Sequence, residues 1–305
     1  MKKFIIKCSV FILVFFLLDK AFVVFRNLSA KHDFDKRLEL VLNGKVNKDL
    51  LVFGSSRADS NIATWMLQDS LNIEAYNLSY RGATISFQEF VLKQLIVNNN
   101  KPKYIIKLLD NDFELMHQDY DGHVRSFRID RLTPLIKYSE IRNELINKGE
   151  KNKVFSKLFV LHQLSKSNLY NSKPPKLNDT ILEFGAKPNN RHIEDLKWTY
   201  KNARVYNKSL EIPDEIESFL NFQKICAEHD IKLILATSPV FYSMDDGWLE
   251  RMEELILPTA TLYIHNKEDK QYLNPENYFN YSHLNRDGAL VFTNELLTFL
   301  KQELK

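Results

Sequence analysis

Cysteine is scarce in this sequence, which holds two cysteines, Cys8 and Cys226, among its 305 residues. Two cysteines, one of them inside an apolar N-terminal segment, cannot form a disulfide framework or supply a set of metal ligands. Cys226 falls in a predicted helix and is expected to pack there as a small buried hydrophobe. A low cysteine content suits an exported and a cytosolic protein alike, so it leaves the compartment open.

A surplus of one charge is also missing. The 42 Lys and Arg residues are scattered among 39 Asp and Glu residues, for a formal net charge of +3. No basic run is present that would suit a phosphate backbone, so we expect no nucleic-acid partner. Repeats and low-complexity tracts are absent too, and a composition of 44% hydrophobic and 27% charged residues predicts an ordinary globular domain with a sizeable core.

The N-terminal segment is strongly apolar. An uncharged stretch, Cys8–Leu18, follows Lys2, Lys3 and Lys7. A helix over Phe4–Phe25 would reach ~33 Å, enough to cross a hydrocarbon core of ~30 Å. The basic residues before the apolar run predict a cytoplasmic N-terminus. We therefore expect residues 1–28 to form a single-pass membrane anchor, with the C-terminal domain in the periplasm or outside the cell.

A cleaved signal peptide is the alternative for this segment. Cys8–Leu18 alone has the length of a signal core, and Leu28-Ser29-Ala30 is a possible, although poor, cleavage site. A buried core helix is a third interpretation, which the apolar residues on all sides of the segment disfavour. A lipoprotein is disfavoured because Lys7 stands directly before Cys8, where a small residue is needed. The uncleaved anchor is the favoured interpretation.

The rest of the chain divides into a lead-in, residues 29–48, and a long domain, residues 49–305. The lead-in is polar with apolar residues at helical spacing, Phe34, Leu38 and Leu42, which predicts a stalk or a helix. In the long domain, strand and helix patterns alternate. Strands are expected at 49–53, 73–77, 103–109, 231–236 and 261–265, and helices at 62–71, 85–97, 214–229, 247–257 and 285–300. Such alternation predicts an α/β fold with a central parallel sheet covered on both faces.

The middle of the chain, at about 113–210, has a weaker pattern. Helical stretches at 135–147 and 154–164 and a loop around Pro174-Pro175 predict a mainly helical insertion. We expect this insertion to belong to the same domain and to form a lid over the carboxyl edge of the sheet.

Four places carry residues suited to chemistry, each at the end of a strand or before the last helix, where ligands bind in open parallel sheets. A turn such as Gly54-Ser55-Ser56-Arg57 exposes a hydroxyl beside free backbone N–H groups, which suits a nucleophile. Gly82 could bring its N–H close to a ligand, and Asn111 could donate its side-chain amide to an oxyanion. His283 completes the set. Taken singly, such residues more often serve as caps, turn glycines or structural histidines.

Together, the order Ser, Gly, Asn, His resembles the SGNH hydrolase superfamily of GDSL-like esterases. Gly54-Ser55-Ser56 matches its Gly-Asp-Ser block, and the second-block glycine falls on Gly82. Asn111-Asp112 matches the third block, with Leu109 in place of a glycine, while His283 matches the last block, whose Asp position holds Asn280. The phrase His-Leu-Asn-x-x-Gly-Ala at 283–289 is the most specific piece and is similar to bacterial envelope SGNH proteins. The resemblance covers about 49–111 and 231–300.

The resemblance implies a three-layer α/β/α sandwich with a Ser-His catalytic pair. Ser56 would attack an ester carbonyl and His283 would take its proton. The N–H groups of Ser56 and Gly82 and the side chain of Asn111 would form the oxyanion hole. Asn280 would complete the triad without a charge, and the chemistry requires no metal and no organic cofactor.

Neighbouring residues have weaker implied roles. Arg57 and Arg81 either hold an anionic substrate or lie solvated on the surface. Asp110 and Asp112 either orient Asn111 or cap the turn. Glu276 and Asp287 are the carboxylates nearest to His283 in sequence that could lend it charge, and Pro239 is expected to shape the pocket wall.

We therefore expect a serine esterase that removes acyl groups, such as acetyl, from an extracytoplasmic glycan or another envelope ester. An O-acyltransferase that modifies an envelope polysaccharide is the alternative. A scaffold that keeps the fold but has lost catalysis, because Asn280 replaces the acid, is an alternative of another class.

Overall fold

The computed structural model describes residues 1–28, 36–111, 114–116, 125–132, 135, 138–149, 159, 183–190, 196–197, 206–242 and 246–304. The chain forms two compact units. The first comprises Met1–Glu39 and Asp121–Lys176, and the second comprises Leu40–Tyr120 and Leu177–Lys305. The lid predicted at 113–210 stays a prediction, because much of that segment lies outside the described residues.

The second unit is built on a five-stranded, entirely parallel sheet, as the alternation of strands and helices predicts. Its strands are β1 (Leu50–Phe53), β2 (Ala75–Asn77), β3 (Tyr104–Leu108), β4 (Lys232–Ala236) and β5 (Ala260–Tyr263), in the order β2-β1-β3-β4-β5. In this order the chain leaves β1 toward one edge of the sheet and builds from β3 toward the other. Such a reversal leaves a crevice at the carboxyl ends of the central strands.

The strands are apolar on both sides, which is typical of a parallel sheet between helices. All four residues of β1 are buried. Val52 pairs with Ile106 of β3, which in turn pairs with Ile234 of β4. These three side chains belong to one hydrophobic cluster, whereas Phe53 packs its ring edge-on against Phe222, with centroids 5.3 Å apart. The sheet is therefore covered on two sides.

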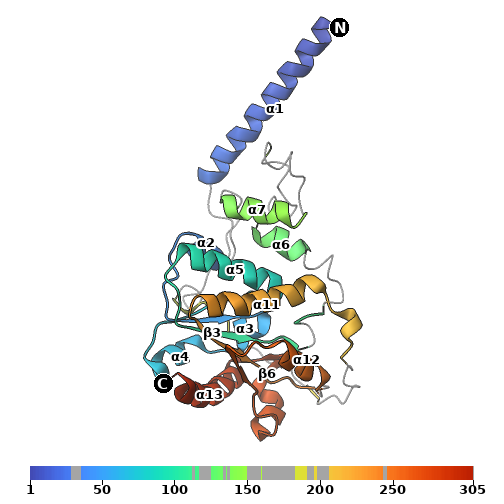
Figure 1. Cartoon of the computed structure of the whole chain (residues 1–305). Helices are drawn as coiled ribbons and strands as arrows, with labels where there is room; N and C mark the ends of the chain where they lie inside the picture. Colours follow the sequence, from blue (N-terminus) through green and yellow to red (C-terminus); the bar gives the residue numbers. More distant parts are fainter. Residues whose placement is uncertain are drawn as a thin grey trace. The chain divides into compact units, whose positions relative to one another are not determined.

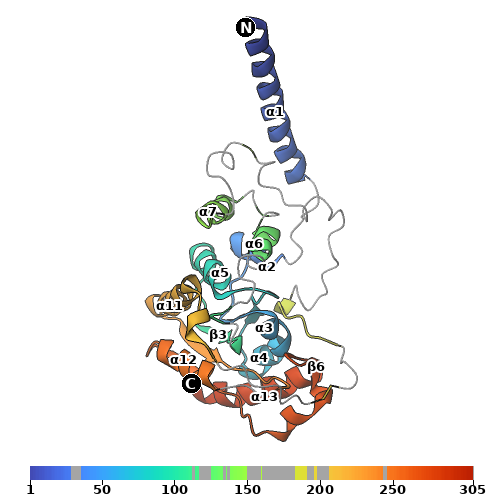
Figure 2. The ribbon, with the colours of Figure 1, turned by 90° about the vertical axis from the view of Figure 1, so that its right-hand side faces the viewer.

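The helices divide between the two faces. Figures 1 and 2 show α5 (Ile85–Asn98) and α11 (Pro213–Glu228) on one side of β3, and α4 (Thr64–Leu71) and α13 (Arg286–Glu303) on the other. The short helix α3 (Ser56–Asn61) packs against α13, and α12 (Gly247–Leu255) precedes β5. This arrangement is consistent with a three-layer sandwich and confirms the predicted α/β class.

Local sequence explains where several helices begin and end. Pro213 opens α11, a position where its missing N–H costs no hydrogen bond. The side chain of Asn285 accepts a hydrogen bond from the N–H of Gly288 at 3.0 Å and so caps α13. Asn72 ends α4 in the left-handed conformation, with φ of 52°.

The structure differs from the sequence prediction at α3, which was not expected. Its sequence, Ser-Arg-Ala-Asp-Ser-Asn, is polar and has no helical hydrophobic spacing, yet its last five residues are buried. Tertiary contacts rather than an apolar stripe therefore hold this helix. Among the described residues of the lead-in, the structure has a helix at α2 (Arg37–Leu42). The loop at Pro174-Pro175 and all but one residue of the helix predicted at 154–164 fall outside the described residues.

The first unit contains α1 (Lys2–Leu28), α6 (Arg125–Leu132) and α7 (Ser139–Asn147). An ion pair between Arg128 and Glu144, 3.8 Å apart, joins α6 to α7. The expected membrane-spanning helix falls within α1, whose apolar sequence is interrupted by charged residues. Among the residues that the structure describes, no helix combines the length and the apolar character needed to cross a membrane, so the expected transmembrane helix is not found.

Candidate active site

The turn after β1 places Ser56 at the carboxyl edge of the sheet. Gly54 follows the last residue of the strand and Ser56 begins α3, so the serine hydroxyl stands at the start of a helix. Oγ of Ser56 lies 2.7 Å from Nε2 of His283. The structure therefore brings together the two residues that the sequence predicts as nucleophile and base, although 227 positions separate them.

Gly54 is required by the geometry of this turn. Its φ is +150°, a conformation that residues with a side chain rarely adopt. A Cβ atom at this position would lie 2.5 Å from Cβ of Ala58 and 3.2 Å from the carbonyl oxygen of Leu108. The glycine thus allows α3 to start close against β3, which brings Ser56 toward the end of that strand.

His283 is held by a small hairpin before α13. The hairpin consists of β6 (Tyr278–Asn280) and β7 (His283–Leu284), which pair antiparallel. The N–H of Leu284 donates to Oδ1 of Asn61 at 3.0 Å, and this bond ties the hairpin to α3. Because Asn61 is the last residue of α3 and Ser56 is the first, the same short helix fixes both members of the pair.

Asn280 occupies the place of the acid in a Ser-His-Asp triad. Its Oδ1 accepts hydrogen bonds from the backbone N–H groups of Ser282, at 2.9 Å, and His283, at 3.0 Å. These two donors assign the amide oxygen to this side, so Nδ1 of His283, also 2.9 Å away, carries a proton and donates it to the same oxygen. Nε2 is then unprotonated and can accept from the Ser56 hydroxyl. Neither Glu276 nor Asp287 occupies the third position of the triad.

The surroundings of His283 disfavour its charged form. Burial, followed by the positive charges of Arg57 and Arg81, lowers the pKa of this histidine from 6.5 to about 4. The neutral imidazole is therefore the form present at neutral pH, as a general base requires. Asn280, however, is neutral, so it supplies no negative charge to stabilise the imidazolium.

Gly82 and Asn111 lie around the same cavity as Ser56 and His283, as the sequence predicts. This cavity, which we call the serine cavity, has a volume of about 210 Å³. Gly82 has φ of +81°, and Asn111 has φ of +57°, which is unusual for a residue with a side chain. Asn111 is 4% exposed, and its residue lines the serine cavity.

A buried ion pair holds the turn that carries Asn111. Lys107 in β3 pairs with Glu114, and their side chains are 0% and 2% exposed. The other carboxylate oxygen of Glu114 accepts a hydrogen bond from the N–H of Asp110 at 2.8 Å. Burial and the neighbouring Glu114 charge raise the pKa of Asp110 from 3.8 to about 6. Glu114 thus ties the turn both to the Lys107 side chain in β3 and to the backbone at Asp110. Asp112 lies outside the described residues.

The two arginines differ in what they do. Arg57 is buried, lines the serine cavity, and donates from Nη2 to Oγ of Ser238 at 2.7 Å, which contradicts a solvated surface role. Arg81 is half-exposed and is not part of the cavity wall. It donates from Nε to Asp59 at 2.8 Å and from Nη2 to the carbonyl of Lys187 at 2.9 Å. Arg57 is therefore the better placed of the two to influence the site.

Sequence reasoning missed Tyr242 and Asn61. The Tyr242 hydroxyl lies 3.5 Å from Nδ2 of Asn111, and its residue belongs to the wall of the serine cavity. Asn61 links α3 to β7 across 223 positions of sequence. Neither residue stands in a motif or follows a strand end directly, so no local signal identifies it.

Metal ligands are not gathered at this site. Within the described ranges, no group of three or more His, Cys, Asp and Glu side chains is arranged to hold a metal ion.

Comparison with known proteins adds no family assignment. No protein-family model matches the chain, and no curated protein matches it either. The resemblance to SGNH hydrolases therefore stays an expectation from the sequence motifs.

Proposed function

We propose that the α/β unit is a serine esterase of the SGNH type that removes acyl groups, such as acetyl, from an extracytoplasmic glycan or another envelope ester. The observation that carries this proposal is the 2.7 Å contact between Ser56 Oγ and Nε2 of His283, whose other ring nitrogen is held by Asn280. Contact between a hydroxyl nucleophile and an oriented imidazole is the recurring arrangement of serine hydrolases.

The proposed reaction has two steps. Oγ of Ser56 attacks the ester carbonyl carbon while Nε2 of His283 takes the hydroxyl proton. The negative charge that develops on the carbonyl oxygen is stabilised by the N–H groups of Ser56 and Gly82 and by the Asn111 amide. The carbon–oxygen bond to the alcohol breaks, the alcohol leaves with the proton from His283, and water hydrolyses the acyl-serine by the same route. In an O-acyltransferase, a second hydroxyl would replace that water.

Membrane attachment is a second part of the proposal. Large apolar side chains are exposed along α1 between Phe4 and Leu18, and these two residues are 72% and 61% exposed. Burying such a surface in a lipid layer is favourable. We keep the prediction that the catalytic unit lies outside the cytoplasm. Fractionation tests the attachment: full-length protein should sediment with membranes and resist carbonate extraction, and recovery of a soluble, shortened protein that begins near Lys31 would contradict it.

Hydrolysis is tested with the full chain purified in detergent. A fluorophosphonate probe should label the wild type and Ser55→Ala but not Ser56→Ala, and p-nitrophenyl acetate turnover should follow the same pattern. Ser55 is a matched control because it precedes Ser56 in the same turn and is buried. Labelling that survives the loss of Ser56 would overturn the proposal, and absence of labelling and turnover in the wild type would favour the scaffold.

A further inference from the structure

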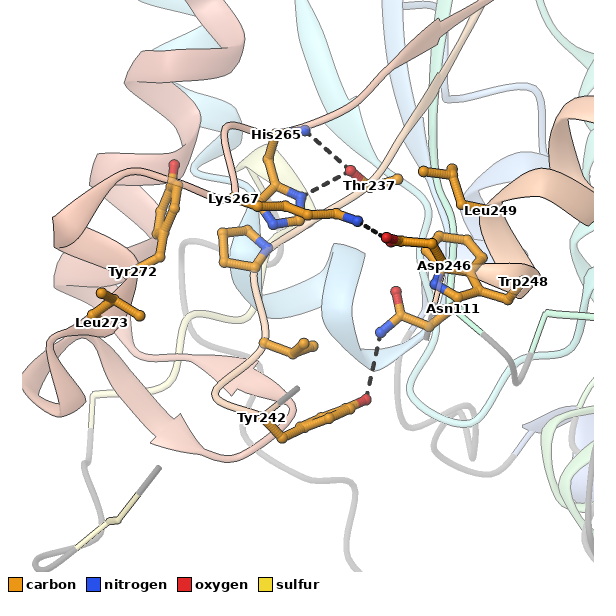
Figure 3. Close-up of a pocket in the computed structure, with 12 residues that line it drawn as sticks. Asn111, Thr237, Tyr242, Asp246, Trp248, Leu249, His265, Lys267, Tyr272 and Leu273 are labelled. Atoms are coloured by element: carbon orange, nitrogen blue, oxygen red, sulfur yellow. Dashed lines mark hydrogen bonds and ion pairs between the residues drawn. The ribbon is translucent and has the colours of Figure 1, made fainter. Parts of the chain in front are cut away.

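A second cavity adjoins the serine cavity, and we call it the side cavity. Its volume is about 250 Å³, and its wall includes Asn111 and Tyr242, which also line the serine cavity. Figure 3 shows these two side chains together at one border of the side cavity. A molecule whose ester carbonyl lies against Asn111 can therefore extend into the side cavity without leaving the protein surface.

The side cavity is larger than an acetyl group requires. A water molecule takes up about 30 Å³ of liquid, so a cavity of about 250 Å³ has room for a ring with substituents. Taken with the serine cavity, the space falls in the range of roughly 300–1,000 Å³ that is typical of small-molecule sites. The side cavity is thus large enough for the part of a substrate beyond the reacting ester.

The wall of the side cavity mixes aromatic surface with hydrogen-bonding groups. Trp248 and Tyr242 contribute aromatic rings, while Asp246, Lys267 and His265 contribute polar atoms. A hydrocarbon chain would leave the remaining hydrogen-bonding capacity of these polar groups unused. A sugar ring has C–H faces that can pack on aromatic rings and hydroxyls that can both donate and accept. The wall therefore suits a sugar better than an acyl chain.

The charges of the side cavity compensate one another. Lys267 reaches across to form an ion pair with Asp246, as Figure 3 shows. His265 is bonded through Nδ1 to Thr237 at 2.8 Å, and burial together with the charges of Arg57 and Lys267 lowers its pKa to about 3, so it is neutral. Among the described residues of this wall no formal charge is left over, so a neutral ligand fits it better than a phosphorylated or acidic one.

The ion pair can also open for a ligand. The side chains of Lys267 and Asp246 are 43% and 66% exposed. Exposed pairs of this kind contribute only about 0–1 kcal/mol, so turning their charged groups toward sugar hydroxyls costs little.

We propose that the side cavity binds a neutral pyranose unit of the glycan whose ester Ser56 attacks. This inference rests on the proposed esterase function for its catalytic role, but binding itself can be measured without catalysis. In hydrolysis the unit belongs to the leaving alcohol; in acyl transfer it would belong to the acceptor.

Binding is tested by saturation-transfer NMR on full-length Ser56→Ala protein in detergent. The probes are methyl β-D-glucopyranoside, glucuronate and octanoate. We expect transfer to the neutral glycoside and little to the other two. The signal should be lost in Asp246→Ala/Lys267→Ala and in Val240→Trp, which fills the side cavity from its partly exposed wall. It should persist in Glu254→Ala/Lys208→Ala, a matched control that removes another exposed ion pair.

Kinetics separate this inference from the proposed function. The ratio of kcat/KM for an O-acetylated methyl glucoside to kcat/KM for ethyl acetate, whose alcohol is too small to fill the side cavity, should fall by about tenfold or more in Val240→Trp. Octanoate binding without glycoside binding, or a glycoside signal unchanged in the cavity variants, would overturn the inference. Turnover of ethyl acetate that is independent of Ser56, with glycoside binding intact, would overturn the esterase and leave the binding site standing.

Discussion

The amide oxygen of Asn280 accepts a hydrogen bond from Nδ1 of His283 at 2.9 Å and another from the backbone N–H of the same histidine at 3.0 Å. The imidazole is thus held in one tautomer by a neutral group. A carboxylate at this position would orient the ring equally well and would also stabilise the imidazolium that forms when His283 takes the serine proton.

Replacing Asn280 by Asp should therefore raise kcat. The opposite replacement, Asp by Asn, can cost a serine hydrolase about 10⁴ in kcat, so we expect Asn280→Asp to gain about tenfold or more. Steady-state hydrolysis of p-nitrophenyl acetate by the two proteins measures this gain. Asn280→Ala is the control: if it keeps wild-type activity while Asn280→Asp abolishes it, then another residue orients His283.

The pH profile of the wild type should reflect the low pKa of His283. A general base works only when unprotonated, and burial and the Arg57 and Arg81 charges lower this pKa to about 4. The kcat/KM should therefore stay level from neutral pH down to about pH 5 and fall below about pH 4. An acid limb near the ordinary histidine value of about 6.5 would contradict this environment. In Asn280→Asp the limb should move to higher pH, because a carboxylate favours the protonated ring.

The buried pair Lys107–Glu114 should be needed for stability and for placing Asn111. Glu114→Gln removes the carboxylate that pairs with the buried Lys107, which should lower the free energy of unfolding by about 3–5 kcal/mol. Urea denaturation measures the loss. The double variant Lys107→Met/Glu114→Gln removes both charges and should recover most of the stability. Equal losses in the single and double variants would show that the pairing of charges is not what stabilises this turn.

Gly54→Ala should impair both folding and the site. The new Cβ would approach Cβ of Ala58 to 2.5 Å, so α3 must shift and carry Ser56 with it. We expect a loss of about 1–3 kcal/mol in unfolding free energy and a fall in kcat. Gly149→Ala is the matched control, because Gly149 also has positive φ, +73°, but a Cβ there would have no neighbour within 4 Å. A similar effect of both changes on kcat would argue against a steric role for Gly54.

The parts of the fold that sequence predicts well are those with a regular pattern of apolar residues. The strand Leu50–Phe53 is recognised because its four residues are all apolar, and the helix Pro213–Glu228 because apolar residues recur in it at helical spacing, as at Phe219, Phe222 and Cys226. The helix α3 is missed because buried polar contacts hold it: Asn61 bonds to Ser238 and to Leu284, 177 and 223 positions away. No local pattern encodes such contacts.

In the candidate site too, the residues marked by a local sequence pattern are predicted, and those placed by distant contacts are not. Ser56, Gly82, Asn111 and His283 are predicted because each follows a strand or precedes a helix, and the sheet topology then brings them together. Tyr242 and the side cavity are not predicted, because they depend on how the segments after β4 and β5 approach each other. The burial of Arg57 is likewise a property of the folded chain.

The distance of 227 positions between Ser56 and His283 also has a consequence for biosynthesis. Ribosomes add roughly 5–20 residues per second, so His283 is made roughly 10–45 s after Ser56. During that interval β1 and the nucleophile turn exist without α13, which covers α3 and α4, and without the hairpin that supplies the imidazole. A growing chain therefore cannot assemble the Ser56–His283 pair, and any esterase activity would begin only after the C-terminal segment has been synthesised and packed.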